Sequence, residues 1–185
     1  DLIGYVKSVD ETGTASIILT DDKAEDIGEV LCQLGMAKRD SSKTTERKSD
    51  DLVNFLPISV GSGDSVLVQI TWVNSPLDFW CQNSVSSKSL EEMNLKLEEF
   101  YTGLKLKELE LTPAIGQACV APFSEDGVWY RSKILKTRGQ EALVEFVDYG
   151  NKERIVLSKL KTIKPEFLEL PPQAFHCCLA GIDVP

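Results

Sequence analysis

Four short candidate strands follow one another from residue 116 onward, and each turn between them contains a glycine. The strands are expected near 117–122, 128–137, 141–147 and 152–157, and the turn glycines are Gly127, Gly139 and Gly150. Short strands at this spacing are typical of a small antiparallel barrel. Behind that barrel the sequence predicts two tight helical turns and a final strand, within 157–163, 164–173 and 174–182.

Two strands and a long helix are predicted before the barrel. The strands are expected near 65–73 and 78–82, joined by a turn at 74–76. The helix is expected to begin at a capping box formed by Ser89 and Glu92, whose side chains would satisfy backbone N–H groups of the first turn. Apolar residues recur at helical spacing and predict one buried face; they are Leu90, Met93, Leu97, Phe100, Tyr101 and Leu104.

The first forty residues predict a hairpin and a helix. Strands near 2–9 and 14–20 flank a turn at 10–13. A helix is expected within 22–40, because acidic residues occupy its first turn and Gly35 lies near its end. Its apolar residues keep helical spacing; they are Ala24, Ile27, Val30, Leu31 and Leu34. The next stretch is charged and rich in serine and threonine, which predicts a flexible linker.

Charge and cysteine content argue against several classes of function. The net charge is −9, and an acidic protein gains nothing from the field of a phosphate backbone, so a basic peptide is a better expected ligand than nucleic acid. The five cysteines lack the paired spacing of a zinc site and His176 is the single histidine, so we predict no metal and no cofactor. The scattered cysteines suit a reducing, intracellular compartment. No apolar run reaches membrane-spanning length, and because the chain begins with Asp1 we expect a piece of a longer protein.

An enzymatic function is not predicted. His176 stands beside Cys177, which would suggest nucleophilic catalysis, but adjacent residues on a strand point to opposite faces and cannot contact each other directly. The chain lacks phosphate-binding, dinucleotide-binding and serine-hydrolase motifs, and no carboxylate has an obvious partner in a pocket. We therefore name no catalytic residue and expect structural roles for His176 and Cys177.

Aromatic residues are the chemical feature of the predicted barrel. Trp129 and Tyr130 are neighbours, so one faces the core and the other faces out or into a site, and the sequence does not settle which. In the segment VEFVDYGN, Phe146 ends a strand and Tyr149 enters the turn. Together with Phe123, these rings either enclose a cation through the negative faces of their π systems or fill the core of a small barrel.

Residues 116–165 strongly resemble a Tudor domain. The segments VAPFSEDGVWYRSKIL and ALVEFVDYGNKERI match the signature of that family in order, spacing and identity, above all in WYR followed by FVDYGN. The surroundings resemble the extended Tudor unit of germline multi-Tudor proteins, and this resemblance covers about 58–185. It implies a mainly β fold with helices (α+β), in which a small Tudor barrel is inserted in an OB-fold like that of staphylococcal nuclease and is linked to it by a long helix.

The resemblance also implies a division of the chain into segments. These are a closing hairpin and helix of the OB-like unit at 1–40, a linker at 41–57, opening strands at 58–87, a connecting helix at 88–112, the Tudor barrel at 113–166 and a return to the OB-like unit at 167–185. Half of an OB-fold would expose apolar strand edges to water, which is costly. We therefore expect 1–36 to pack against 65–82 and 175–182, in the same chain or by exchange with a neighbour.

In that family, four rings and one asparagine bind symmetrically dimethylated arginine. Carried over by matching motif, the methylarginine-binding residues are Phe123, Tyr130, Phe146, Tyr149 and Asn151. Methylation keeps the charge of a guanidinium, removes N–H donors and adds apolar surface, so the cation stacks between rings while the asparagine accepts a remaining N–H. Asp148 is expected to stabilise the turn, and an acidic rim is expected to attract an arginine-rich peptide; its residues are Glu125, Asp126 and Glu145.

The implied function is that of a reader for arginine-rich N-terminal tails of Piwi-class proteins. Its parent would be a scaffold of cytoplasmic germ granules (nuage) in gene silencing guided by Piwi-interacting RNA, with no membrane partner. Two alternatives stay open, a methyllysine reader on chromatin and an RNA-binding or nuclease-like OB module. The asparagine argues against the first, because a trimethylammonium group has no N–H to donate. The acidic charge argues against the second.

Overall fold

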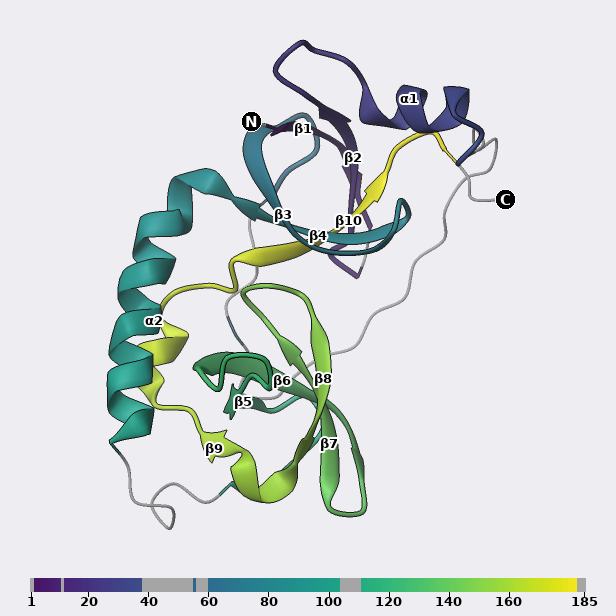
Figure 1. The fold of residues 1–185 in the computed structure, drawn as a ribbon. Coiled ribbons are helices and arrows are strands. Elements are labelled where there is room, and N and C mark those ends of the chain that lie inside the picture. The colour runs from purple at the N-terminus through teal and green to yellow at the C-terminus, as the bar shows by residue number, and fades with distance from the viewer. Residues whose placement is uncertain (1, 11, 38–54, 56–59, 104–110, 183–185) are drawn as a thin grey trace. The chain divides into compact units, whose positions relative to one another are not determined.

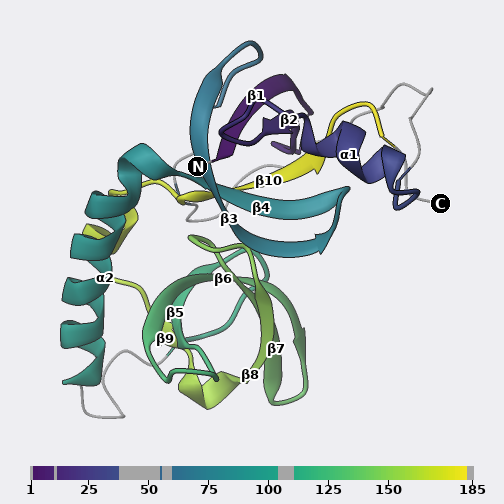
Figure 2. The same cartoon turned by 45° about the horizontal axis from the view of Figure 1, so that its top comes forward.

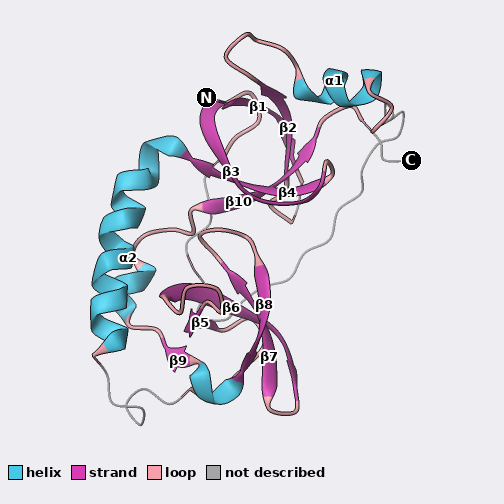
Figure 3. Cartoon of the chain, viewed as in Figure 1, coloured by secondary structure: helices cyan, strands magenta, loops and turns pink. Residues whose placement is uncertain are grey.

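The computed structural model describes residues 2–10, 12–37, 55, 60–103 and 111–182. These residues form two compact units (Figure 1). Of the described residues, 2–10, 12–37, 60–85 and 174–182 belong to unit 1, and 55, 86–103 and 111–173 belong to unit 2. Strands dominate both units (Figure 3), which agrees with the predicted mainly β fold with helices. The predicted linker lies outside the described residues, apart from Phe55.

Unit 1 is a closed barrel of five strands in the order β1-β2-β10-β4-β3, with one short helix. The strands are β1 (Leu2–Val9), β2 (Ala15–Thr20), β3 (Ser65–Ser75), β4 (Asp78–Asn83) and β10 (Ala174–Leu179), and the helix is α1 (Ile27–Gln33). Alternate side chains along each strand point inward. The buried core that they form includes Val6, Ile17, Val68, Cys81 and Cys177.

The N-terminal hairpin completes this barrel within the same chain. Strand β1 pairs antiparallel with β3, with Ile3 opposite Leu67, and β2 pairs in parallel with β10, with Ile17 opposite Leu179. The prediction that the first 36 residues pack against the later strands is confirmed by these pairings. Each piece has an apolar face and open strand edges that the other covers, and closing the barrel removes both from water.

Helix α1 is shorter than its apolar spacing suggested. Asp26 is its N-cap, and the Asp26 carboxylate accepts a hydrogen bond from the backbone N–H of Gly28 at 2.8 Å. Ala24 has a φ of +62° and lies outside the helix, although it fits the apolar pattern. The helix ends at Gln33, and Gly35 follows with a φ of +72°. The cap and the left-handed residue, and not the apolar spacing, therefore decide the length of this helix.

Unit 2 contains a five-stranded antiparallel sheet in the order β8-β7-β6-β5-β9. Figure 2 shows how these strands curl round into a small barrel-like form. The elements are β5 (Ala118–Pro122), β6 (Trp129–Arg138), β7 (Glu141–Phe146), β8 (Lys152–Val156), β9 (Lys161–Thr162) and the 3-10 turns η2 (Leu157–Lys159) and η3 (Pro165–Leu168). The four predicted strands are confirmed with nearly unchanged bounds. The two predicted helical turns are present but shorter than 157–163 and 164–173, and the unpredicted strand β9 lies within the first of these segments.

The long helix α2 (Ser87–Thr102) follows the 3-10 turn η1 (Ser84–Ser86). The predicted capping box of Ser89 and Glu92 is wrong, because η1 continues directly into the helix and both residues lie inside its first turns. The predicted extension to residue 112 is also wrong, since the helix ends at Thr102 and residues 111–114 are not helical.

The apolar face of α2 is confirmed. Leu90, Leu97 and Tyr101 are buried, and the last two belong to a core cluster with Val120 and Phe167. Leu104, the last residue of the predicted stripe, lies outside the described residues. The helix thus packs on the sheet of unit 2 through the stripe that its sequence pattern indicates.

Candidate functional site

Four aromatic side chains meet at one end of the sheet of unit 2. Phe123 follows β5, Tyr130 lies near the start of β6, Phe146 ends β7, and Tyr149 stands in the turn before β8. Because neighbouring strands of an antiparallel sheet alternate in direction, these four positions lie at the same end. We call these four residues the aromatic cage.

The rings of the aromatic cage stand nearly perpendicular to one another. The centroid of Tyr130 lies 6.4 Å from that of Phe123, 6.0 Å from Phe146 and 5.3 Å from Tyr149, at interplanar angles of 76°, 85° and 81°. Phe123 and Phe146 lie 5.4 Å apart at 78°. Only 1% of Phe146 is exposed, whereas the other three rings are partly exposed. Phe146 therefore forms a buried floor, and the others form walls that reach solvent.

The turn between β7 and β8 places Tyr149 and Asn151 beside Phe146. The backbone N–H groups of Tyr149 and Gly150 donate to the carbonyl of Phe146 at 3.0 and 2.7 Å, and the N–H of Phe146 donates to the carbonyl of Asn151 at 2.9 Å. Gly150 has a φ of +87°, a conformation that residues with a Cβ rarely adopt. Asn151 is 8% exposed. All five predicted site residues are thus held together by one turn and the strand ends beside it.

The structure settles which of the neighbouring aromatics Trp129 and Tyr130 faces the cage. Tyr130 contacts the three other cage rings. Trp129 instead packs near Tyr101 of α2, with 5.8 Å between ring centroids, in a separate hydrophobic cluster. Alternation along β6 therefore assigns one ring to the cage and the other to the helix contact.

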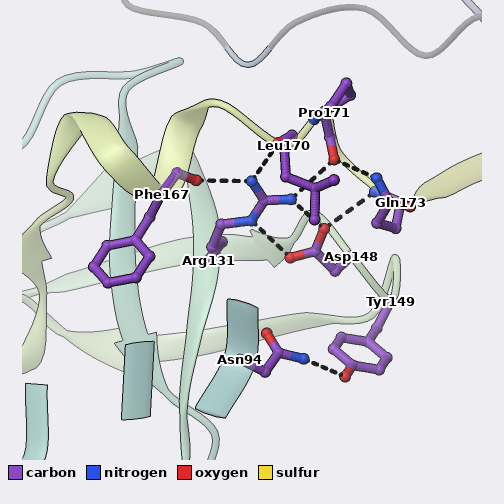
Figure 4. Close-up of polar contacts among 8 residues, drawn as sticks. All are labelled: Asn94, Arg131, Asp148, Tyr149, Phe167, Leu170, Pro171 and Gln173. Atoms are coloured by element: carbon purple, nitrogen blue, oxygen red, sulfur yellow. Dashed lines mark hydrogen bonds and ion pairs between the residues drawn. The ribbon is translucent and has the colours of Figure 1, made fainter. Parts of the chain in front are cut away.

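A buried ion pair anchors the turn that carries Tyr149 (Figure 4). Arg131 Nε donates to Asp148 Oδ2 at 2.9 Å and Arg131 Nη2 donates to Asp148 Oδ1 at 2.6 Å, with both side chains at most 1% exposed. The guanidinium also donates to the carbonyls of Phe167, Leu170 and Pro171. The expected structural role of Asp148 is thereby supported, and its partner Arg131 was missed by sequence reasoning.

Helix α2 contributes two polar contacts beside the cage that the sequence did not reveal as functional. Asn94 Nδ2 donates to Tyr149 Oη at 3.1 Å (Figure 4). The Glu98 carboxylate accepts the backbone N–H of Trp129 at 2.7 Å. Both residues follow the helical spacing of the apolar stripe through Leu90 and Leu97. A polar side chain on an otherwise buried helix face is the signal that could have identified them.

The predicted acidic rim is present only in part. Asp126 accepts the hydroxyl hydrogen bond of Tyr130 at 2.9 Å, so its carboxylate lies directly at the cage. Glu125 is exposed in the same turn. The assignment of Glu145 to the rim is wrong, because its side chain alternates with that of Phe146 along β7 and forms an ion pair with Lys152 at 3.6 Å.

The pKa values of the two tyrosine hydroxyls of the cage are raised, so both stay protonated at a higher pH than an ordinary tyrosine does. Burial raises the pKa of Tyr130, and its hydrogen bond to Asp126 raises the pKa further. Burial, and then the charge of Asp148, raise the pKa of Tyr149, while the N–H that Asn94 donates acts in the opposite direction. Neutral tyrosines leave the π faces and the nearby carboxylate as the features that attract a cation.

Elsewhere in the chain, the residues considered for catalysis have structural contacts. The two ring nitrogens of His176 lie 2.9 Å from Thr14 Oγ1 and 2.7 Å from Asp78 Oδ1, while Cys177 is buried in the core of unit 1. Within the described ranges, no group of three or more His, Cys, Asp or Glu is placed to hold a metal ion. No helix in that part of the chain is long and apolar enough to cross a bilayer.

Comparison with known proteins identifies the family. A family model described as Tudor domain matches residues 61–181, which is more than half of the chain and includes the whole cage. The chain belongs to the Tudor domain family. The predicted family is therefore confirmed by a match that extends beyond the residues that first suggested it.

Two longer proteins contain segments similar to this Tudor chain. Human Tudor domain-containing protein 1 is 40% identical over 136 residues, covering 73% of this chain and 11% of that protein. Mouse RING finger protein 17 is 37% identical over 158 residues, covering 83% of this chain and 9% of that protein. The chain thus spans only a small part of the length of these relatives.

Solved extended Tudor domains share this fold. One from human Tudor domain-containing protein 1, in complex with a symmetrically dimethylated peptide, has a TM-score of 0.63 and 36% identity, covering 72% of this chain and 67% of that chain. Another is from Papi of Drosophila melanogaster, in complex with a symmetrically dimethylated Piwi N-terminal peptide. It has a TM-score of 0.57 and 32% identity, and the match covers 61% of this chain and 59% of that chain.

Proposed function

We propose that this Tudor domain is a reader without catalytic activity, which binds symmetrically dimethylated arginine in the arginine-rich tails of Piwi-class proteins. The observation that carries the proposal is the cage, in which Tyr130 contacts three other rings at nearly right angles. Two similar extended Tudor domains were solved with symmetrically dimethylated peptides, one of them from the N-terminus of Piwi.

The proposed ligand uses both parts of the site. The dimethylguanidinium stacks against the rings of the aromatic cage, each good contact contributing about 0.5–2 kcal/mol. Asn151 accepts an N–H that methylation leaves on the guanidinium. Asp126, fixed by the Tyr130 hydroxyl at 2.9 Å, adds negative charge where the rest of an arginine-rich peptide would pass. Ring stacking favours the methylated cation, while the single asparagine acceptor favours the symmetric arrangement of methyl groups.

We further propose that unit 1 is an OB-like module related to staphylococcal nuclease, into which the Tudor barrel is inserted. Its five strands close into a barrel, and one helix follows the hairpin, which supports this assignment. The segments 1–40, 58–87 and 174–185 would then form the module, with 88–112 as the connection and 113–166 as the Tudor barrel. Residues 167–173, which were expected to return to the module, belong to unit 2. Helix α2 supplies the helical part of that connection.

At the level of the whole protein, we propose a scaffold that gathers Piwi-class proteins in cytoplasmic germ granules. The relatives include Tudor domain-containing protein 1 and Drosophila Protein tudor, of which the chain matches only 11% and 5%. A single methylarginine buries little area, so one domain is expected to bind at roughly micromolar affinity. Several such domains on one chain would raise the effective affinity for a tail with several methylarginines.

Calorimetric titration of four matched peptides tests the proposed function. The peptides share one arginine–glycine sequence, and their central residue is arginine, symmetric dimethylarginine, asymmetric dimethylarginine or trimethyllysine. We expect the symmetric peptide to bind most tightly, because each of its terminal nitrogens carries both a methyl group for the rings and an N–H for Asn151. Equal affinity for all four peptides, or tightest binding of trimethyllysine, would reject the proposal and would favour a methyllysine reader.

A further inference from the structure

We infer that Asn94 of helix α2 is a positioning residue of the cage, which fixes the hydroxyl and therefore the ring of Tyr149. The inference rests on the proposed function. Asn94 Nδ2 donates to Tyr149 Oη at 3.1 Å (Figure 4). Tyr149 in turn stands 5.3 Å from Tyr130 at 81°, so the helix reaches the cage through one hydrogen bond to one wall.

The hydroxyl of Tyr149 is contacted by helix α2, whereas Phe146 and Tyr130 are supported by other contacts. Phe146 lies in the barrel core, and the Tyr130 hydroxyl is held by Asp126 at 2.9 Å. Tyr149 instead lies in a turn, where its backbone is anchored by Phe146. A side chain at a turn can rotate about its own bonds unless its far end is held. Asn94 holds that far end.

The amide of Asn94 is itself in an unusual environment. Its Oδ1 is buried, and the described residues offer this atom no hydrogen-bond partner. A buried polar atom without a partner is unfavourable, and an apolar residue at position 94 would avoid that penalty. The hydrogen bond to Tyr149 explains why an asparagine, and not an apolar residue, occupies this position on the face of α2 that packs on the sheet.

The rest of α2 makes a local role for Asn94 testable. The helix is held on the sheet by Leu97 and Tyr101, which are at most 3% exposed, and by the bond from Trp129 N to Glu98 at 2.7 Å. These contacts do not involve Asn94. Loss of its amide is therefore expected to release the Tyr149 ring without releasing the helix.

The main experiment is a double-mutant cycle on the full chain, measured as affinity for the symmetric dimethylarginine peptide. Asn94→Ala removes the donor and Tyr149→Phe removes the acceptor while keeping the ring. We expect each to weaken binding about threefold to tenfold, which is about 0.7–1.4 kcal/mol, and the double variant to be no weaker than either. Independent effects that multiply in the double variant, or unchanged affinity of Asn94→Ala, would overturn the inference.

Two further variants separate positioning from a general effect on the helix. Leu95→Ala shortens the neighbouring side chain, which is 67% exposed, and should leave affinity unchanged. Asn94→Asp keeps a partner for Tyr149, since its carboxylate accepts the hydroxyl hydrogen, and should bind at least as well as the wild type. A loss in Asn94→Asp equal to that in Asn94→Ala would contradict a role in holding the ring.

A readout without ligand distinguishes this inference from the proposed function. The tyrosine titration followed by NMR with ring-labelled tyrosine reports the Tyr149 hydroxyl directly. The Asn94 N–H lowers the pKa of Tyr149, so Asn94→Ala should raise that pKa further. If the peptide fails to bind the wild type, the proposed function is rejected, while the shift in the pKa of Tyr149 still reports the contact with Asn94. An unchanged Tyr149 titration in Asn94→Ala would overturn the inference whether or not the peptide binds.

Discussion

Arg131 and Asp148 form a bidentate ion pair in the interior of unit 2, with nitrogen–oxygen distances of 2.9 and 2.6 Å. The pair links β6 to the residue that immediately precedes Tyr149. It also binds the carbonyls of the segment that leads out of unit 2, and Asp148 accepts the backbone N–H of Gln173 at 3.1 Å. One buried contact therefore supports both the cage turn and the exit of the chain.

Asp148→Ala should destabilise unit 2 by about 3–5 kcal/mol, because it leaves the Arg131 charge buried without its partner. Denaturant unfolding followed through amide signals of β6 measures this change. Glu145→Ala is the matched control, since it breaks a partly exposed ion pair with Lys152 and should cost no more than about 1 kcal/mol. Similar losses in the two variants would show that the buried pair has no special role.

Phe123→Ala and Tyr130→Ala should each weaken binding of the symmetric dimethylarginine peptide at least tenfold, about 1.4 kcal/mol, while unit 2 stays folded. Tyr5→Ala removes a partly exposed ring of unit 1 and should leave the affinity unchanged. Phe146→Ala is not a clean test, because this ring is 1% exposed in the core and its loss should also cost about 3–5 kcal/mol of stability. Unchanged calorimetric affinity in both wall variants would refute the cage.

Asn151→Ala should reduce the preference for symmetric over asymmetric dimethylarginine. An N–H buried against the site without an acceptor costs about 1–3 kcal/mol. In the symmetric mark the nitrogen that donates this N–H also carries a methyl group, so Asn151 and the rings would bind the same nitrogen. The ratio of the two dissociation constants is the quantity to measure, with Asn74→Ala in unit 1 as the control. A ratio equal to that of the wild type would remove Asn151 as the discriminating residue.

Tyr101 should make the stability of unit 2 fall at alkaline pH. Its hydroxyl donates to the carbonyl of Thr162 at 2.8 Å, and burial raises its pKa from 10.0 to about 12. The unfolded chain then loses the Tyr101 hydroxyl proton at a lower pH than the native chain does. The contribution of Tyr101 to the free energy of unfolding is therefore complete below pH 10 and is lost between about pH 10 and 12. Denaturant midpoints across this range should fall more steeply for the wild type than for Tyr101→Phe; parallel curves would disprove the linkage.

Two neighbouring isoleucines of β2 test the closed barrel of unit 1. Ile17 is fully buried, so Ile17→Ala should lower the free energy of unfolding by about 2–5 kcal/mol. Ile18 points to the opposite face and is only partly buried, so Ile18→Ala should cost clearly less. Equal losses, measured by denaturant unfolding of unit 1, would argue against the inward register of β2.

The sequence was sufficient to predict those structural features that depend on a few neighbouring residues. Turns that need a glycine, such as the one at Gly150, and alternation along a strand depend on a few neighbouring residues. Four of the five strands of unit 2, β5 to β8, were therefore predicted with nearly correct bounds. The cage residues followed from a family motif that lies within thirty residues of chain. The helix starts were predicted less well, because α1 begins at its cap Asp26 and α2 continues directly from the 3-10 turn η1, and apolar spacing reveals neither position.

By itself, the sequence determined the strand pattern, the Tudor family, the set of cage residues and the need of the N-terminal hairpin for an apolar partner. Only the tertiary structure decided which partner a polar group finds far along the chain: Asp148 with Arg131, and Tyr149 with Asn94. The physical reason is range. Strand alternation and turns are set by adjacent residues, whereas a hydrogen bond between Asn94 and Tyr149 joins positions 55 residues apart and exists only once helix and sheet have packed.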